Sequence, residues 1–309
     1  MSTRNPTLSI GMPVHNGLPF LPEALESLLG QTYDDFELII SDNASDDGTA
    51  EVCGEFARRD ARIRLLRNSE NLGAAENYNR VVREARGRYF KWAAADDNCL
   101  PPYLERCVNV LASRDDVVLC YPKTQLIDKC GLRIAEYEDN MHIDHPSVSR
   151  RLRHVFRTVG KANCVFGVIR TDALCRTNLI GPYRASDYVL LAELSMLGKF
   201  HEVPGRLFLR RIHEDQSAVG KTDREIAEWF RPYHAGGGTF PMWRLFGEHI
   251  RAIHRSSQPL VKRVACYPQL VHLLRRHRSS LFREIGCARL LTQGIFRWSA
   301  AGNEPVNVR

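Results

Sequence analysis

Two adjacent carboxylates, Asp96 and Asp97, follow a short apolar stretch at residues 89–95. That stretch has the composition of a buried strand, and Pro101 and Pro102 then open a helical segment, so both acids are placed on a loop at a strand's carboxyl end. Neighbouring carboxylates repel each other unless a cation or strong donors lie between them. Mg²⁺ typically bridges one or two carboxylates to substrate phosphates. The pair therefore indicates a metal-dependent site for a phosphorylated ligand; the alternative is a turn whose side-chain oxygens cap the next helix.

The two acids belong to a chain in which apolar strands and amphipathic helices alternate. Strands are predicted at residues 8–14, 36–41, 63–67 and 89–95, and a helical stretch follows each of the first three. This alternation is typical of βαβ units and a parallel sheet, and it predicts an α/β fold. Right-handed crossovers place the carboxyl ends of all such strands at one edge of the sheet, where ligands of open α/β sheets bind.

Polar residues follow each of these strands and are expected to converge at that edge. They are Asn16, Asp42, Asn71 with Gly73, and the Asp96–Asp97 pair. One polar loop at a strand end is ordinary, but four at one edge indicate a pocket. The chain has no G-x-G-x-x-G and no G-x-x-x-x-G-K-[ST], which argues against a dinucleotide site and a P-loop.

The rest of the chain continues the α/β pattern and then becomes helical. Residues 141–149 are polar and rich in His, so they are a candidate mobile loop, and Asp187 stands at the front of a helix predicted over 188–197. Apolar stripes after residue 230 are interpreted as core packing, with partner or membrane contact as the alternative. Further strands are predicted at 117–121, 133–137, 163–170, 200–203 and 206–212.

Composition and charge limit the class of protein. No apolar run approaches the roughly 18 residues of a membrane-spanning helix, no secretory signal is recognised, and nine scattered cysteines suit free thiols in a reducing cytosol. The expected location is therefore cytoplasmic, or at the inner face of the plasma membrane. Residues 221–309 hold 15 of the Lys and Arg residues but 6 of the Asp and Glu residues. This basic segment is expected to meet an anionic membrane surface or another chain, including a second copy; no nucleic-acid-reading module is recognised.

Six segments of the chain together resemble the inverting glycosyltransferases of family 2, which have the GT-A fold. Each motif alone is weak, but six in the right order are specific. The resemblance covers about residues 7–220. The matching segments are residues 9–17, residues 41–49, Asn71-Leu72-Gly73 with Asn77, Ala95-Asp96-Asp97, Ser186-Asp187-Tyr188, and Arg211-Ile212-His213 with Ser217.

The resemblance implies transfer of a sugar from a nucleotide-diphosphate donor, with a UDP-sugar as the expected donor, to an acceptor hydroxyl. Asp97 resembles the residue that binds Mg²⁺ or Mn²⁺, and Asp96 contacts the ribose or assists the metal. His213 is a further metal or diphosphate ligand; the alternative for a lone His is a structural role. The implied nucleotide-sugar-binding residues are Pro13, Val14, His15, Asn16, Asp42, Asn71, Gly73, Asn77 and Asp96, with Asp42 bonded to the nucleobase.

Inversion requires a base on the face opposite the leaving group, and Asp187 matches that residue. The alternative for Asp187 is a helix N-cap. One departure from the family pattern matters. Many members carry an acid two residues before Asp96, where this chain has Ala94, so the metal is expected to rest on fewer carboxylates.

The resemblance divides the chain into a GT-A domain at residues 1–220, with a donor-binding half (1–115) and an acceptor half (116–220), and a basic helical extension at 221–309. The expected acceptor is a glycan or a lipid-linked molecule of cell-envelope or polysaccharide biosynthesis. Such acceptors lie at an anionic membrane surface, which the basic helical extension is expected to meet. Two other functions remain open. A sugar-nucleotide pyrophosphorylase would need a Gly-rich basic loop that His15-Asn16-Gly17 does not supply, and a non-catalytic nucleotide-sugar binder would not need Asp187.

Overall fold

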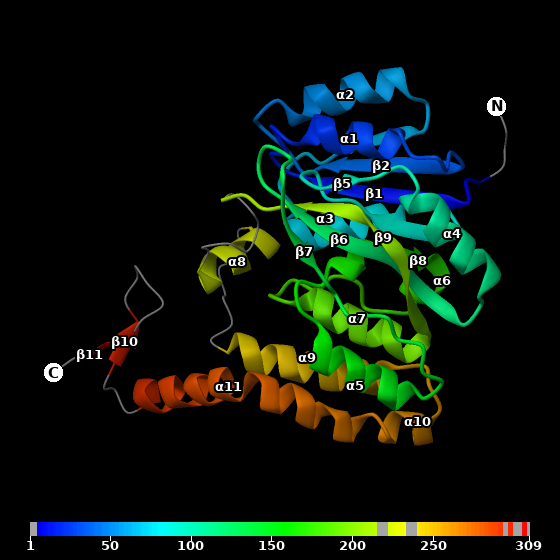
Figure 1. Cartoon of the computed structure of the whole chain (residues 1–309). Coiled ribbons are helices and arrows are strands. Elements are labelled where there is room, and N and C mark those ends of the chain that lie inside the picture. The colour runs from blue at the N-terminus through cyan, green and yellow to red at the C-terminus, as the bar shows by residue number, and fades with distance from the viewer. Residues whose placement is uncertain (1–4, 215–221, 233–239, 293–295, 299–304, 308–309) are drawn as a thin grey trace.

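The computed structural model describes residues 5–214, 222–232, 240–292, 296–298 and 305–307. Its centre is a nine-stranded sheet in which eight strands run in the order β3-β2-β1-β4-β8-β6-β9-β5 and β7 pairs with β6 (Figure 1). The strands of this sheet are β1 (Leu8–Val14), β2 (Phe36–Asp42), β3 (Ile63–Arg67), β4 (Tyr89–Trp92), β5 (Asn98–Cys99), β6 (Val117–Ile127), β7 (Arg133–Tyr137), β8 (Val168–Arg170) and β9 (Lys199–Arg211). A separate hairpin joins β10 (Phe296–Trp298) and β11 (Pro305–Asn307).

The four N-terminal strands form the parallel half of the sheet, as predicted. Strand β1 pairs in parallel with β2 on one side and β4 on the other, and β2 pairs in parallel with β3. Val14 lies opposite Asp42, and the amide of Ala93 donates to the carbonyl of Gly11 at 2.9 Å. The carboxyl ends of these strands therefore meet at one edge, and the predicted convergence of the loops that follow them is confirmed.

The C-terminal strands make the sheet mixed. Strand β8 is antiparallel to both β4 and β6, while β9 is parallel to β6 and antiparallel to β5. The two strands predicted at 200–203 and 206–212 are one strand, β9, because both segments pair with β6. Strand β6 itself ends at Ile127, six residues beyond the predicted end at Tyr121.

Two predictions in this half are wrong. Half of the strand predicted at 163–170 is a 3-10 turn (Asn163–Phe166), in which the amide of Val165 donates to the carbonyl of Ala162, and only β8 is a strand. The segment 141–149, predicted as a candidate mobile loop, is anchored at its start. Met141 and Ile143 are buried, and Ile143 forms an isolated β-bridge with Phe200.

Helices cover both faces of the sheet (Figure 1). Helices α1, α2 and α4 bury one hydrophobic core with it, and α3, α5, α6 and α7 bury a second core on the opposite face. Their bounds are α1 (Leu21–Leu29), α2 (Thr49–Arg59), α3 (Ala74–Arg83), α4 (Tyr103–Ser113), α5 (Val148–Thr158), α6 (Thr171–Leu174) and α7 (Ser186–Leu197).

The C-terminal helices are part of the second core. Leu245, Ile253, Leu270 and Leu273 share one buried cluster with side chains of α5 and α7. Core packing of the two predicted apolar stripes is confirmed only in part, because Trp243, Ile250 and Leu274 of those stripes are each 37% exposed. Among the described helices, none combines the length and hydropathy needed to cross a bilayer. The eight described cysteines are free thiols. These last elements are α8 (Asp223–Phe230), α9 (Pro241–Arg255), α10 (Leu260–Val264), a 3-10 turn (Tyr267–Gln269) and α11 (Leu270–Thr292).

Candidate active site

The loops after β1 and β2 are tied directly to each other. The amide of Asn16 donates to Ser45 Oγ at 2.9 Å, and the amide of Gly17 donates to Thr49 Oγ1 at 2.8 Å. Asn16 has a φ of 52°, in the left-handed region that Asn tolerates better than most residues. Its side chain bonds Asp46 in both directions, at 2.9 and 3.1 Å. The first two predicted loops therefore form one braced rim.

Asp42 lies at the base of this rim. Its side chain is fully buried at the end of β2, and one carboxylate oxygen accepts from the amide of Ser45 at 3.1 Å. The other oxygen makes no hydrogen bond to a described residue and lies 3.4 Å from Arg67 Nε. A buried acceptor without a hydrogen bond is costly, and a donor N–H of a bound nucleobase would satisfy it.

A chain of amides completes the rim. Asn43 Nδ2 donates to Asn71 Oδ1 at 2.7 Å, and Asn71 Nδ2 lies 3.2 Å from His15 Nε2. Asn77 differs, because its Nδ2 donates to the carbonyls of Ser41 at 2.9 Å and Val14 at 3.4 Å. The buried Asn77 amide thus ties the ends of β1 and β2 together. Its expected contact with the donor stays a prediction.

The Asp96–Asp97 turn is fixed by strand β9. Arg211, which is buried, donates its amide to Asp97 Oδ1 and its Nε to the carbonyl of Asp96, both at 2.9 Å. Its guanidinium also binds Glu23 Oε2 at 2.6 Å and donates to the carbonyls of residues 128 and 129. Arg211 therefore holds the turn in two ways: its backbone amide binds the carboxylate of Asp97, and its side chain ties the Asp96 carbonyl to α1 and to the loop after β6.

His213 joins the acidic turn as the resemblance implies. Its Nε2 lies 3.0 Å from Asp96 Oδ2, while its buried Nδ1 has no hydrogen-bond partner in the described structure. The ring packs against Phe20, with centroids 4.8 Å apart. The described residues contain no group of three or more His, Cys, Asp or Glu side chains arranged to hold a metal. Ser217, the last residue of that motif, lies outside the described residues.

The electrostatics of the acidic turn fit a cation. Burial, and then repulsion from Asp96, raise the pKa of Asp97 to about 7. Arg210 opposes this rise through its positive charge. The ionisation of the Asp97 carboxyl group is thus suppressed by burial and by its neighbour, a condition that a bound cation would relieve. Two carboxylates alone fit a hard divalent cation only if a bound phosphate supplies further oxygen ligands.

Asp187 reaches the same region from α7. Burial raises the pKa of its carboxyl group to about 6, while the amide of Tyr188 and the charge of Arg210 act in the opposite direction. The pKa of Tyr78 is raised by burial and then by Asp96, Asp97 and Asp187. The same buried phenol is therefore within electrostatic reach of all three acids.

The alternative role of Asp187 as a helix cap is not what the structure shows. The N-cap of α7 is Ala185, with a φ of 60°, and no side chain caps this helix end. Asp187 lies in the first turn, where its Oδ1 accepts from the neighbouring amide of Tyr188 at 3.1 Å. Its carboxylate is therefore not committed to ending the helix.

Gly73 has a steric role beside the rim. Its φ is 82°, and a Cβ added there would lie 2.3 Å from the carbonyl oxygen of Phe230, at the end of α8. Helix α8 therefore packs directly over the loop that follows β3 (Figure 1). Pro13, like Val14, is a buried residue of β1 and is paired with Ser41, so both reach the site with their backbone.

Sequence reasoning missed Glu23, Tyr78 and Arg210. Glu23 looks like a solvent residue of α1, yet it binds Arg211 and Asn98. Arg210 donates to Asn163 and to the carbonyl of Lys161, and its charge favours the ionised forms of both Asp97 and Asp187. No local pattern could have found these partners, since each contact joins segments far apart in sequence.

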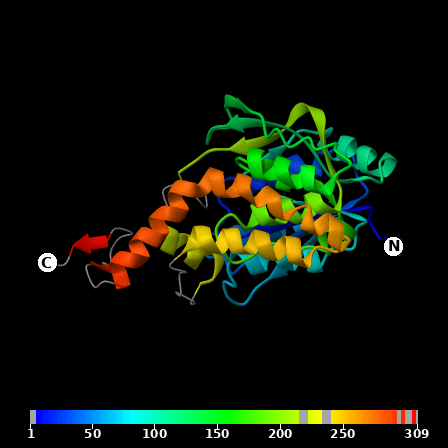
Figure 2. The same cartoon turned by 90° about the horizontal axis from the view of Figure 1, so that it is seen from below.

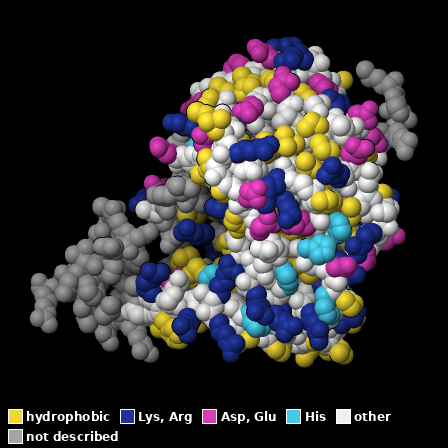
Figure 3. All heavy atoms as spheres, in the orientation of Figure 1, with side chains coloured by type: hydrophobic (Ala, Val, Ile, Leu, Met, Phe, Trp, Pro, Cys, Tyr) yellow, Lys and Arg dark blue, Asp and Glu magenta, His cyan; other side chains and the backbone are white. Residues whose placement is uncertain are grey.

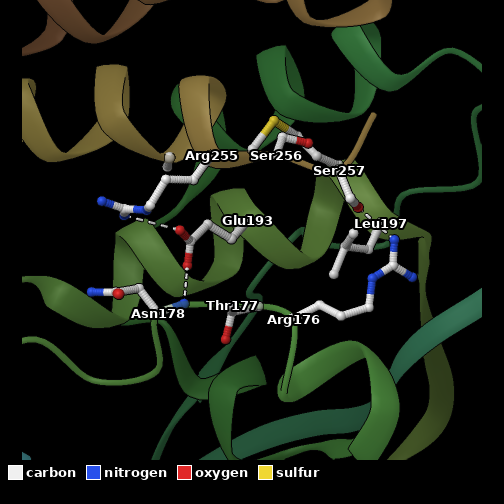
Figure 4. Close-up of a pocket in the computed structure, with 10 residues that line it drawn as sticks. Arg176, Thr177, Asn178, Glu193, Leu197, Arg255, Ser256 and Ser257 are labelled. Carbon is white, nitrogen blue, oxygen red and sulfur yellow. Dashed lines mark hydrogen bonds and ion pairs between the residues drawn. The ribbon is translucent and has the colours of Figure 1, made fainter. Parts of the chain in front are cut away.

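A separate hollow of about 100 Å³ lies between α7, α9 and the segment after α6 (Figure 4). Glu193 points into it and is bonded by the amide of Asn178 at 2.8 Å and by Arg255 at 3.1 Å. It contains none of the predicted site residues. The ion pair between Glu193 of α7 and Arg255 of α9 joins these two helices beside the hollow.

Comparison with known proteins adds to this geometry. Residues 9–161 match the model of glycosyl transferase family 2. An uncharacterised glycosyltransferase of Haemophilus influenzae is 25% identical over 219 residues, which cover 69% of this chain and 68% of that protein. Several further curated relatives, all named as uncharacterised glycosyltransferases, are matched over less than half of their own length.

Solved structures share the fold. A structure of residues 1–349 of S. aureus TarS in complex with UDP-GlcNAc superposes with a TM-score of 0.65 at 12% identity, over 92% of this chain and 81% of that one. The mannosyltransferase PcManGT of Pyrobaculum calidifontis, in complex with GDP-Man and Mn²⁺, superposes with a TM-score of 0.53 at 17% identity, over 94% and 81%. The curled sheet with flanking helices is thus the GT-A arrangement.

Proposed function

From the premise that this chain is a glycosyltransferase of family 2, we propose that it is a metal-dependent, inverting enzyme. We propose further that it transfers a sugar from a UDP-sugar to a hydroxyl of a glycan or lipid-linked acceptor. This acceptor would belong to cell-envelope or polysaccharide biosynthesis. The observation that carries this proposal is that the Asp42 rim and the Asp96–Asp97 turn follow the two strands that flank β1 in parallel, at one edge of the sheet. The charge of Asp187, which acts on the same phenol as that turn, supports its inclusion. The neighbours bound to UDP-GlcNAc and GDP-Man support a nucleotide-sugar donor.

The donor would lie along the rim. Asp42 accepts from an N–H of the base through the oxygen that has no hydrogen bond, and Asn16, Asn71 and His15 border the ribose. Gly73 allows the end of α8 to pack against the loop after β3, beside this rim. The diphosphate then reaches the acidic turn, where Asp97, Asp96 and His213 would hold Mg²⁺ or Mn²⁺. Such an ion, when bound, supplies positive charge that stabilises the leaving diphosphate.

Asp187 acts on the acceptor. Its carboxylate takes the proton of the acceptor hydroxyl while that oxygen bonds to the anomeric carbon and the bond from this carbon to the diphosphate breaks. Backbone hydrogen bonds, and to a smaller extent the charge of Arg210, oppose the rise in the pKa of Asp187 that burial causes. Because a base near neutrality balances correct protonation against driving force, a pKa of about 6 suits this role.

Thermal shift and diphosphate release together test the proposal. Ligands that bind the folded state raise the melting temperature according to their affinity. We expect a UDP-sugar with Mn²⁺ to raise it more than a GDP-sugar or either component alone, and we expect release of UDP. As a matched pair, Asp42→Asn should weaken donor binding, whereas Asp35→Asn, at an exposed position on the approach to the same strand, should not. No stabilisation by any nucleotide-sugar in the presence of Mn²⁺ would overturn the proposal.

A further inference from the structure

Two acid-free stretches of the chain pack together on the side of the molecule opposite α1 and α2. Residues 145–171 contain no Asp or Glu, and neither do residues 249–283. The first stretch contains α5, and the second contains the end of α9, all of α10 and the first part of α11. Helices α10 and α11 both contact α5, and Figure 2 shows α11 beside α5 and α9 from below. Their cations therefore share one surface.

We call this surface the basic face and define it by six side chains of α5, α10 and α11. The pKa of His272 is lowered by burial and then by Arg157, Arg153 and Arg275, so cations from α5 and α11 surround one point. In the part of the chain that the structure describes, no carboxylate forms an ion pair with any of the six. Figure 3 shows Lys and Arg side chains gathered over these lower helices. The six are Arg150, Arg153, Arg157, Lys262, Arg275 and Arg278.

Exposed apolar side chains border the basic face. Leu260, Val261 and Val264 of α10 are 68%, 80% and 56% exposed, and they lie on either side of Lys262. Val271, at the start of α11, is 40% exposed. Side chains of this kind normally lie in a core, and a cluster of them rimmed by charge marks an interaction surface. A basic helical surface with exposed Leu and Val is the composition of an interfacial membrane contact.

We propose that the basic face docks the protein on an anionic lipid bilayer, with Leu260, Val261 and Val264 inserted among the lipid headgroups. A second copy of the chain fits poorly, because a two-fold contact would place cations against cations. A soluble polyanion such as nucleic acid would be bound by the cations but would leave the apolar side chains of α10 in water. The proposal concerns where the enzyme lies and does not depend on the donor or on the catalytic residues.

Vesicle flotation with the full chain tests the docking. The probes are vesicles of phosphatidylcholine alone and of phosphatidylcholine with phosphatidylglycerol, at low and high salt. The charge variant is Arg153→Gln/Arg157→Gln/Arg275→Gln. Its matched control is Arg58→Gln/Arg59→Gln/Arg83→Gln, which removes the same net charge from exposed positions of α2 and α3. The apolar variant is Leu260→Ser/Val261→Ser, and its melting temperature reports whether it folds.

We expect wild-type protein to float with anionic vesicles at low salt and to be released by high salt, because screening shortens the reach of charge. The charge variant should bind on the order of 100-fold more weakly, from about one kcal/mol per cation near an anionic surface. The apolar variant should also lose at least roughly tenfold, and the control should bind like wild type.

Three results would overturn the proposal. The first is wild-type protein that stays unbound with anionic vesicles at low salt. The second is a charge variant that binds no more weakly than the control variant, which would mean that net charge and not this face attracts the vesicles. The third is a folded apolar variant with unchanged binding to anionic vesicles, which would show that Leu260 and Val261 do not insert among the lipid headgroups.

Discussion

Replacing Asp187 with Asn removes the proposed base while keeping the shape of its side chain. A positioned general base contributes typically about 10²- to 10⁴-fold to rate, which equals roughly 3 to 5 kcal/mol of barrier. Because the Asp187 carboxylate is not the cap of α7, the substitution should not unfold the helix. We therefore expect Asp187→Asn to lower kcat by at least about 100-fold with unchanged donor affinity.

The pH dependence gives a second measure of the same residue. A base must be ionised, so activity should rise as pH increases through the pKa of about 6. The ionised fraction of such a group is about one tenth at pH 5 and nearly complete at pH 7.5, so the rate should increase about tenfold over this interval. Asp187→Asn should flatten this limb of the profile.

The assay is release of nucleoside diphosphate under saturating donor, with donor affinity measured separately by calorimetry. Asp115→Asn, at a side chain that is 92% exposed, is the matched control and should retain wild-type kinetics. If Asp187→Asn binds donor normally and transfers sugar at the wild-type rate, the assignment of Asp187 as base is refuted. A loss of both folding and binding would instead show a structural role.

Three further predictions concern the supports of the site. Arg211→Met should lower the free energy of unfolding by about 1–3 kcal/mol, because it leaves three backbone carbonyls without their buried donor, whereas the half-exposed Glu23 is solvated by water; a urea titration that shows no change would contradict the bracing role. Gly73→Ala should destabilise the protein by roughly 1–3 kcal/mol, because its Cβ would collide with Phe230. In contrast, Gly247→Ala should stabilise it by up to about 1 kcal/mol, because Gly247 lies on α9 with open space around it. Removing divalent metal with a chelator should abolish the stabilisation by nucleotide-sugar, and equal melting shifts with and without chelator would exclude a metal-bridged diphosphate.

Hydrophobic patterning was enough to predict the parallel half of the sheet. Strand β1 occupies the predicted residues 8–14 and β3 the predicted 63–67, because both are short segments rich in aliphatic residues that end at polar turns. The convergence of their loops followed from chain handedness alone. The C-terminal strands were harder, because their lengths depend on partners: β6 and β9 extend each other through pairing that no local signal reports.

The site residues also divide into those that could be predicted from the sequence and those that could not. Asp42, Asp96, Asp97 and His213 could be found because their types and positions resemble a family pattern. The contact of Arg211 with Glu23 could not, since the two residues are 188 positions apart. The roles of individual side chains were also out of reach. Nothing in the sequence indicates that the side-chain amide of Asn77 would donate hydrogen bonds to two backbone carbonyls.

Arg211 links the acidic turn to the outer helix α1. Glu23 is about half exposed on α1 and binds the guanidinium of Arg211, whose Nε donates to the backbone carbonyl of Asp96. A change at Glu23 would therefore be transmitted to the orientation of the acidic carboxylates without altering any group that contacts the donor. Variants selected for a different sugar or metal should accumulate on this outward helix as well as inside the cleft.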